Sequence, residues 1–184
     1  MNGLYSFFQT ILKDKTQLFF PIIASFFLFI LFSSWFGLIP GVGSILIKHG
    51  KESEPILRAG TADLNLTIAL ALISVILSQY FGIKYVGMKK YIKKFINPTN
   101  FLTLFTGVLE MVSEFSKIIS FAFRLFGNIF AGEVLIAVVV FLVPVFIPAS
   151  FPFLLLEIFV GAIQALVFSM LTAVFFNMAI SEHH

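Results

Sequence analysis

The stretch ISFAFRLFGNIFAGEVLIAVVVFLVPVF, residues 119–146, decides the class of fold. It is apolar along nearly its whole length, and an α-helix needs about 20 such residues to cross the hydrocarbon core of a membrane. Arg124, Asn128 and Glu133 nevertheless lie inside it. An arginine at the centre of a membrane helix costs about 2.5–3.5 kcal/mol even on scales from insertion experiments, so Arg124 requires a structural or functional reason.

The rest of the chain has the same character. Of its 184 residues 59% are hydrophobic and 11% are charged, and the apolar residues come in runs long enough to span a membrane. We therefore expect an all-α integral membrane protein with a single membrane domain over residues 1–184. The absence of cysteine excludes disulfides, thiolate metal sites and cysteine nucleophiles.

Breaks in the apolar runs divide the chain into segments. We expect an amphipathic lead-in over 1–17, membrane spans over 18–39 and 64–83, a basic loop over 84–98, and two long helices over 101–147 and 151–180. At about 1.5 Å per residue each long helix exceeds the hydrocarbon thickness of roughly 30 Å. The expected fold is thus two transmembrane helices followed by a long, strongly tilted helical hairpin.

Lysines set the predicted orientation. Five of them follow the second span without a neighbouring acid: Lys84, Lys89, Lys90, Lys93 and Lys94. By the positive-inside rule this loop is cytoplasmic. Because the number of expected crossings is even, both termini are expected on the cytoplasmic side as well.

Polar residues of the first long helix form a stripe. At about 100° per residue, positions four or seven apart lie close together on the helix surface. The residues with this spacing are Glu110, Glu114, Lys117, Arg124 and Asn128. Glu133 lies nine residues beyond Arg124 and is expected on the opposite face. On the second long helix one face carries Glu157, Gly161, Gln164, Phe168 and Thr172.

These residues allow structural as well as functional interpretations. Glu110, Glu114 and Lys117 have the spacing of a salt-bridge network near the headgroups. Gln164 by itself fits an ordinary hydrogen bond between packed membrane helices, and Arg124 could have the same structural role. Buried carboxyl groups such as Glu133 and Glu157 can stay neutral, as hydrogen-bond donors or as proton carriers.

Two other classes of protein have to be weighed. A secondary transporter could hold an anionic substrate on Arg124, but the second half of the chain does not repeat in the first half, as it does in many transporters. An enzyme would need catalytic motifs, and the sequence has no phosphate-binding loop, no metal-ligand cluster and no nucleophile with a base. We therefore expect no catalytic site, metal or cofactor in this chain.

Four sequence blocks carry a family resemblance. They are TADLNLTIALAL, LEMVSEFSKIIS, SFAFRLFGNIFAGE and IQALVFSMLTAVFFNMAISEHH. In this order they resemble subunit a of the F-type ATP synthases, the membrane stator of a rotary motor, from about Phe19 to the end of the chain. The RLFGN and AGE blocks look bacterial rather than mitochondrial, which implies the bacterial plasma membrane, although plastid relatives remain possible.

The resemblance implies a function. In the family, an arginine at the position of Arg124 faces a carboxyl group on the rotating ring of c subunits, which two offset half-channels connect to the two sides of the membrane. Proton flow through these channels is coupled to ATP synthesis elsewhere in the complex. The implied partners are the c-ring, the peripheral stalk of subunit b, the rest of the synthase and membrane lipid, but no nucleic acid.

The resemblance also implies roles for six further residues. Those of the outer half-channel and the surroundings of the arginine are Asn128, Glu133, Glu157 and Gln164. Those of the inner half-channel are Glu110 and Ser120.

The sequence departs from the family pattern in two ways. Glu157 stands where many bacterial relatives have histidine, so we expect Glu133 and Glu157 to share one proton, or a cation, near neutral pH. The chain also begins just before the family's second span. A misassigned start, a fragment or a lineage without the first span would each explain this, and contacts with the peripheral stalk depend on which holds.

Overall fold

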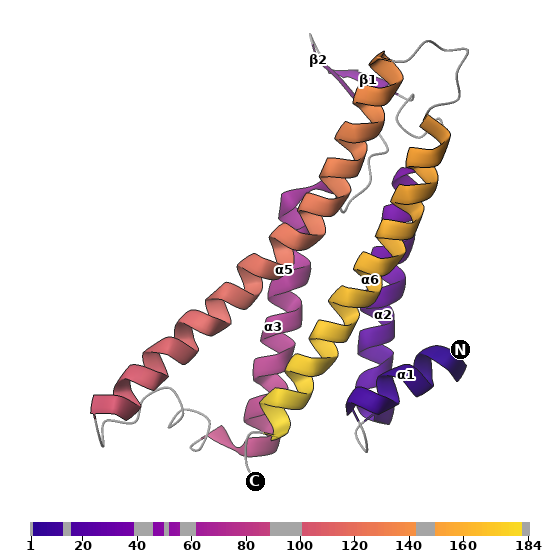
Figure 1. The fold of residues 1–184 in the computed structure, drawn as a ribbon. Helices are drawn as coiled ribbons and strands as arrows, with labels where there is room; N and C mark the ends of the chain where they lie inside the picture. Colours follow the sequence, from indigo (N-terminus) through magenta and orange to yellow (C-terminus); the bar gives the residue numbers. More distant parts are fainter. Residues whose placement is uncertain are drawn as a thin grey trace.

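The computed structural model describes residues 2–12, 16–38, 46–49, 52–55, 62–88, 101–142 and 150–181. Its elements are α1 (Asn2–Leu12), α2 (Thr16–Gly37), β1 (Leu46–His49), β2 (Glu52–Pro55), α3 (Leu64–Val86), α5 (Phe101–Leu142) and α6 (Ser150–Ser181) (Figure 1). Most of the expected basic loop, residues 89–98, lies outside the described residues, as does the expected helical segment over 143–147.

Among the described residues, four helices are long and apolar enough to cross a membrane. The qualifying segments are Thr16–Gly37, Leu64–Val86, Phe105–Val139 and Phe151–Ile180. The prediction of a helical integral membrane protein is confirmed. α5, with 42 residues, is about twice the length that a perpendicular crossing needs.

A small β-hairpin departs from the expected all-α chain. β1 and β2 pair antiparallel, with Leu46 opposite Pro55 and His49 opposite Glu52, in the segment between the two expected membrane spans. The sequence leaves Gly50 and Lys51 between the strands, and glycine at the first of two connecting residues favours a tight hairpin.

The ends of α3 are fixed by local backbone chemistry. The Asp63 carboxylate accepts a hydrogen bond from the Asn65 N–H at 2.8 Å, which satisfies a donor that the first helical turn leaves free. At the other end Gly87 has a φ of 93° and donates its N–H to the Ile83 carbonyl at 2.9 Å. A left-handed backbone here favours glycine and ends the helix.

Two groups of buried side chains hold the helices together. In the middle of the bundle, Ile30 of α2, Ala71 of α3, Leu125 of α5 and Phe168 of α6 belong to one cluster. A second cluster brings together α1, the start of α2 and the ends of α3 and α6 through Phe8, Phe19, Phe81 and Phe176. The start of α2 and the ends of α3 and α6 therefore lie at one end of the bundle, beside α1 (Figure 1).

Hydroxyl groups add polar contacts between α3 and α6. The Ser74 and Thr172 hydroxyls are 2.8 Å apart, and both residues are fully buried. Ser78 donates to the Phe175 carbonyl at 3.2 Å. Small hydroxyl residues let membrane helices approach closely and also bond across the interface, and α3 uses them in this way.

The first half of α5 leaves the bundle. Figure 1 shows α5 inclined away from α3 and α6 toward its N-terminal end. Its large apolar side chains there are each more than half exposed: Phe105, Val108, Leu109, Met111, Val112 and Phe115. So large an exposed apolar surface suits lipid or a partner helix rather than water.

Candidate functional site

Arg124 lies on the outer surface of the bundle. The residues that α5 buries nearby are Phe121, Ala122, Leu125 and Ile129, whereas Arg124 and Ser120 are exposed beside this buried face. Within the described residues, the Arg124 Nη2 donates to the Ser120 hydroxyl at the long distance of 3.5 Å. The guanidinium has five donor hydrogens, so its capacity to bind an anion from outside the bundle is largely unused.

One turn beyond Arg124, an amide pair joins α5 to α6. The Asn128 Nδ2 donates to the Gln164 Oε1 at 2.7 Å, and Gln164 is 3% exposed. The predicted face of α6 is confirmed, because its five members are all buried: Glu157, Gly161, Gln164, Phe168 and Thr172. Polar residues on this face are therefore directed into the bundle.

Glu157 lies deep in the contact between α6 and α5. It is 8% exposed, and its carboxyl group lies against Gly132, where an added Cβ would be 2.5 Å from Oε1. Glu133, the next residue of α5, is half-buried and close enough to interact with Glu157 electrostatically. The Glu157 Oε2 is buried and has no hydrogen-bond partner in the part of the chain that the structure describes.

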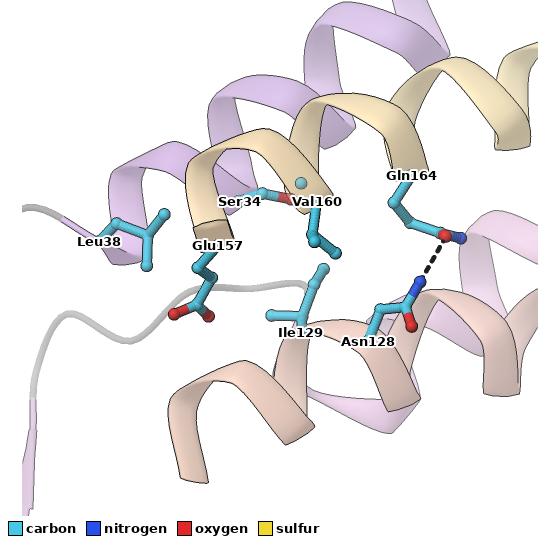
Figure 2. Close-up of a pocket in the computed structure, with 8 residues that line it drawn as sticks. Ser34, Leu38, Asn128, Ile129, Glu157, Val160 and Gln164 are labelled. Atoms are coloured by element: carbon cyan, nitrogen blue, oxygen red, sulfur yellow. Dashed lines mark hydrogen bonds between the residues drawn. The ribbon is translucent and has the colours of Figure 1, made fainter. Parts of the chain in front are cut away.

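A small pocket is lined by Glu157 and by the Asn128–Gln164 pair. Its lining residues are Ser34 of α2 and Leu38 directly after that helix, Asn128 and Ile129 of α5, and Glu157, Val160, Gly161 and Gln164 of α6 (Figure 2). It leaves about 10 Å³ for the centre of a water molecule, at the lower end of what one ordered water needs. Figure 2 shows Glu157 projecting from α6 toward α5, with the Asn128–Gln164 bond across the pocket.

Ser34 and Gly132 were not among the candidate residues. Ser34 is 6% exposed, and its hydroxyl donates to the Ile30 carbonyl at 2.8 Å. Near it the Trp35 Nε1 donates to the Ile158 carbonyl at 3.2 Å, so α2 is docked onto the turn of α6 that carries Glu157. Small residues within long apolar helices are the one sequence signal that could have indicated such close contacts.

The acids near the start of α5 lie apart from this pocket. Lys117 pairs with Glu114 at 2.6 Å, and its ammonium lies 4.8 Å from the ring centroid of Phe175 on α6. The salt-bridge interpretation thus holds for this pair. Glu110 is half-buried and about 21 Å along the helix from Arg124, at about 1.5 Å per residue, so the structure does not bring it to the pocket.

The comparisons with known proteins agree on one family. The sequence model of the ATP synthase A chain matches residues 1–177. The chain belongs to this family. The resemblance seen in the four sequence blocks is confirmed, and the comparisons give no support to a secondary transporter.

The ATP synthase A chain family includes bacterial and chloroplast relatives of this chain. ATP synthase subunit a of Syntrophobacter fumaroxidans (strain DSM 10017 / MPOB) is 35% identical over 184 residues, which cover 100% of this chain and 70% of the relative. The chloroplastic subunits a of Stigeoclonium helveticum and Oedogonium cardiacum are 42% and 38% identical over 164 residues, 89% of this chain. These matches cover 62% and 60% of the two relatives, so the chain spans less than two thirds of their length.

Proposed function

We propose that this chain is the membrane stator, subunit a, of an F-type ATP synthase, and that it carries protons to and from a rotating c-ring. The exposed position of Arg124 on the apolar outer surface of α5 is the observation that carries the proposal. The chain itself has no catalytic site in this proposal, because ATP is made by other subunits.

Arg124 acts as a permanent charge at the interface with the ring. A guanidinium stays protonated at any physiological pH, and in lipid it needs an anionic partner. A ring carboxyl passing α5 supplies that partner and is held in its ionised form while it is there. Because the cation repels a proton at the same place, it also keeps the two half-channels separate.

The two half-channels lie on either side of Arg124. Asn128, Glu133, Glu157 and Gln164 form the outer one, supported by the amide pair and by the pocket that Asn128, Glu157 and Gln164 line. Ser120 and, further along α5, Glu110 belong to the inner one. Glu133 and Glu157 share one proton or one monovalent cation, since two neighbouring carboxylates in low dielectric do not both stay charged.

The arrangement in the membrane follows from helix lengths and charge. α2 and α3 cross, and α5 and α6 form a strongly tilted hairpin, since each is longer than a perpendicular crossing needs. The end of the bundle that carries α1 and Lys84 faces the cytoplasm, so both termini lie on that side. The membrane is a bacterial plasma membrane. The partners are the c-ring, subunit b, the rest of the synthase and lipid.

Loss of the charge at Arg124 tests the proposal. We expect Arg124→Ala to reduce ATP-driven acidification of membrane vesicles to background at matched levels of the assembled complex. Lys84→Gln removes a cation at the exposed end of α3 and should leave pumping unchanged. Undiminished pumping by Arg124→Ala would mean that the arginine only stabilises helix packing and that the proposed function is wrong.

A further inference from the structure

Phe175 of α6 is a residue at which three helices meet. Its ring is stacked on that of Phe121 of α5, with centroids 5.2 Å apart and an angle of 24° between the planes. The ammonium of Lys117, one turn before Phe121 on the same helix, lies 4.8 Å from the centroid of the Phe175 ring. The Ser78 hydroxyl of α3 donates to the Phe175 carbonyl at 3.2 Å. The Phe175 side chain therefore contacts two successive turns of α5, while its backbone is bonded to α3.

Lys117 is held by charge as well as by packing. Its side chain is 19% exposed, and the Glu114 carboxylate lies 2.6 Å from its ammonium. Glu114 belongs to the same helix, so this ion pair neutralises the charge without joining α5 to α6. Across the helix interface the ammonium faces the Phe175 ring, whose π-electrons attract a cation. The contact between Lys117 and Phe175 is thus a directional link between the two helices, whereas the hydrophobic effect has no direction.

This link lies on the side of α5 that leads to Arg124. The two cations are seven residues apart, which corresponds to about 10.5 Å along the helix axis and about 20° around it. Arg124 is exposed beside the buried Phe121 and Leu125, so the rotation of α5 about its axis decides whether the guanidinium stays on the outer surface. Phe115, just before Lys117, is exposed, and α5 is inclined away from α6 toward its N-terminal end (Figure 1). Lys117 therefore contacts α6 where α5 begins to leave the bundle.

We propose that Lys117 is a positioning residue for Arg124: its ammonium, placed over the Phe175 ring, fixes the rotation of α5 against α6. This inference rests on the proposed function, because it concerns how Arg124 is presented to a passing carboxyl group of the c-ring. Lys117 itself takes no part in proton transfer. When the link is lost, Arg124 is held less firmly between the two half-channels, so protons leak back and fewer are moved for each ATP hydrolysed.

The number of protons pumped per ATP hydrolysed tests this role. Acidification of inverted membrane vesicles and ATP hydrolysis are measured in one preparation, at matched levels of the assembled complex. A purely structural defect lowers both rates together, because it lowers the amount of intact complex, whereas a misplaced Arg124 lowers their ratio. We expect Lys117→Met and Phe175→Leu each to lower this ratio roughly two- to tenfold, the range expected for the loss of one cation–π contact.

Lys84→Met is the matched control. It also removes an ammonium that lies over an aromatic ring, at 6.0 Å from the centroid of Tyr80, but both residues belong to α3. This contact joins no two helices, so we expect Lys84→Met to keep the wild-type ratio of protons to ATP.

Substitutions that keep the cation or the ring separate this role from packing. Lys117→Arg keeps a positive charge and Phe175→Tyr keeps an aromatic ring, so we expect both to retain the wild-type ratio. The double variant Lys117→Met with Phe175→Leu should be no worse than the more impaired single variant, because both changes break the same contact. The double variant Glu114→Gln with Lys117→Met removes both charges, so it should show the loss without leaving an uncompensated carboxylate.

The outcomes tell the two proposals apart. A wild-type ratio in Lys117→Met, alone or together with Glu114→Gln, overturns the inference. An equal loss in Lys117→Arg also overturns it, as do losses in Lys117→Met and Phe175→Leu that multiply in the double variant. Arg124→Ala is measured in the same vesicles, and undiminished pumping by this variant overturns the proposed function itself. Loss of pumping in Arg124→Ala with a wild-type ratio in Lys117→Met overturns this inference alone.

Discussion

Two acids, Glu133 of α5 and Glu157 of α6, lie close together inside an apolar bundle. The Glu157 carboxyl lies against Gly132 and interacts electrostatically with Glu133, the neighbouring residue. In the proposed function these two carboxyls share one proton. Glu133→Gln or Glu157→Gln leaves one acid in place of the pair, so we expect either change to alter how transport depends on pH.

The rate of ATP-driven acidification over a series of outer pH values measures this effect. Glu114→Gln provides a control, because Glu114 is paired with Lys117 away from the pocket. We expect its pH profile to keep the wild-type shape at matched assembly. Identical profiles for the wild type and both Gln variants of the pair would show that the two acids do not share a proton.

At the scale of the helix, Gly132 of α5 leaves room for the Glu157 side chain of α6. A Cβ on Gly132 would be 2.5 Å from the Glu157 Oε1 and 3.1 Å from its Cγ, so Gly132→Ala displaces the carboxyl from the pocket. Because the displaced atoms belong to a flexible side chain, the stability cost stays within the roughly 1–3 kcal/mol typical of overpacking. We expect transport to fall severalfold while the protein still assembles.

Gly127→Ala is the matched control for stability. A Cβ at Gly127 meets nothing within 4 Å, and alanine is favoured over glycine inside a helix by up to about 1 kcal/mol. In thermal unfolding of the purified chain in detergent, Gly127→Ala should be at least as stable as wild type and Gly132→Ala less stable than Gly127→Ala. Wild-type transport by Gly132→Ala would contradict the contact with Glu157.

The local pattern of apolar and polar residues made the helices and the buried face of α6 predictable. Runs of apolar residues set the membrane-capable segments, and a rotation of about 100° per residue placed Glu157 and Gln164 on the buried face of α6. Contacts across helices depend on which faces meet, which no local pattern records. The approach of Ser34 to Gly161 was therefore not predicted, nor was the place that Gly132 leaves for Glu157. The short β-hairpin was not predicted because its two strands have only four residues each, too few for a clear alternating pattern.

For the whole molecule, the arrangement of the helix ends makes the orientation testable. Phe8 of α1 and Phe81 of α3 belong to the same buried cluster, so the N-terminal helix lies at the end of the bundle where α3 finishes. Asn65 and Lys84 are exposed near opposite ends of α3, separated by about 29 Å of helix, close to the thickness of the hydrocarbon core. Labels at Asn65 and Lys84 can therefore test whether the two ends of α3 lie on opposite sides of the membrane.

The absence of native cysteine allows each position to be labelled alone. Single cysteines at Gln9, Asn65 and Lys84 are treated with a membrane-impermeant maleimide in intact cells and in inverted vesicles. We expect Gln9→Cys and Lys84→Cys to react in inverted vesicles and Asn65→Cys in intact cells, because the proposed orientation places the lysines beyond the second span in the cytoplasm. Detergent should expose all three cysteines and so control for their reactivity. Labelling of Asn65→Cys and Lys84→Cys from one side would contradict the crossing by α3, and labelling of Gln9→Cys only from outside would place the N-terminal helix on the wrong side for the proposed stator.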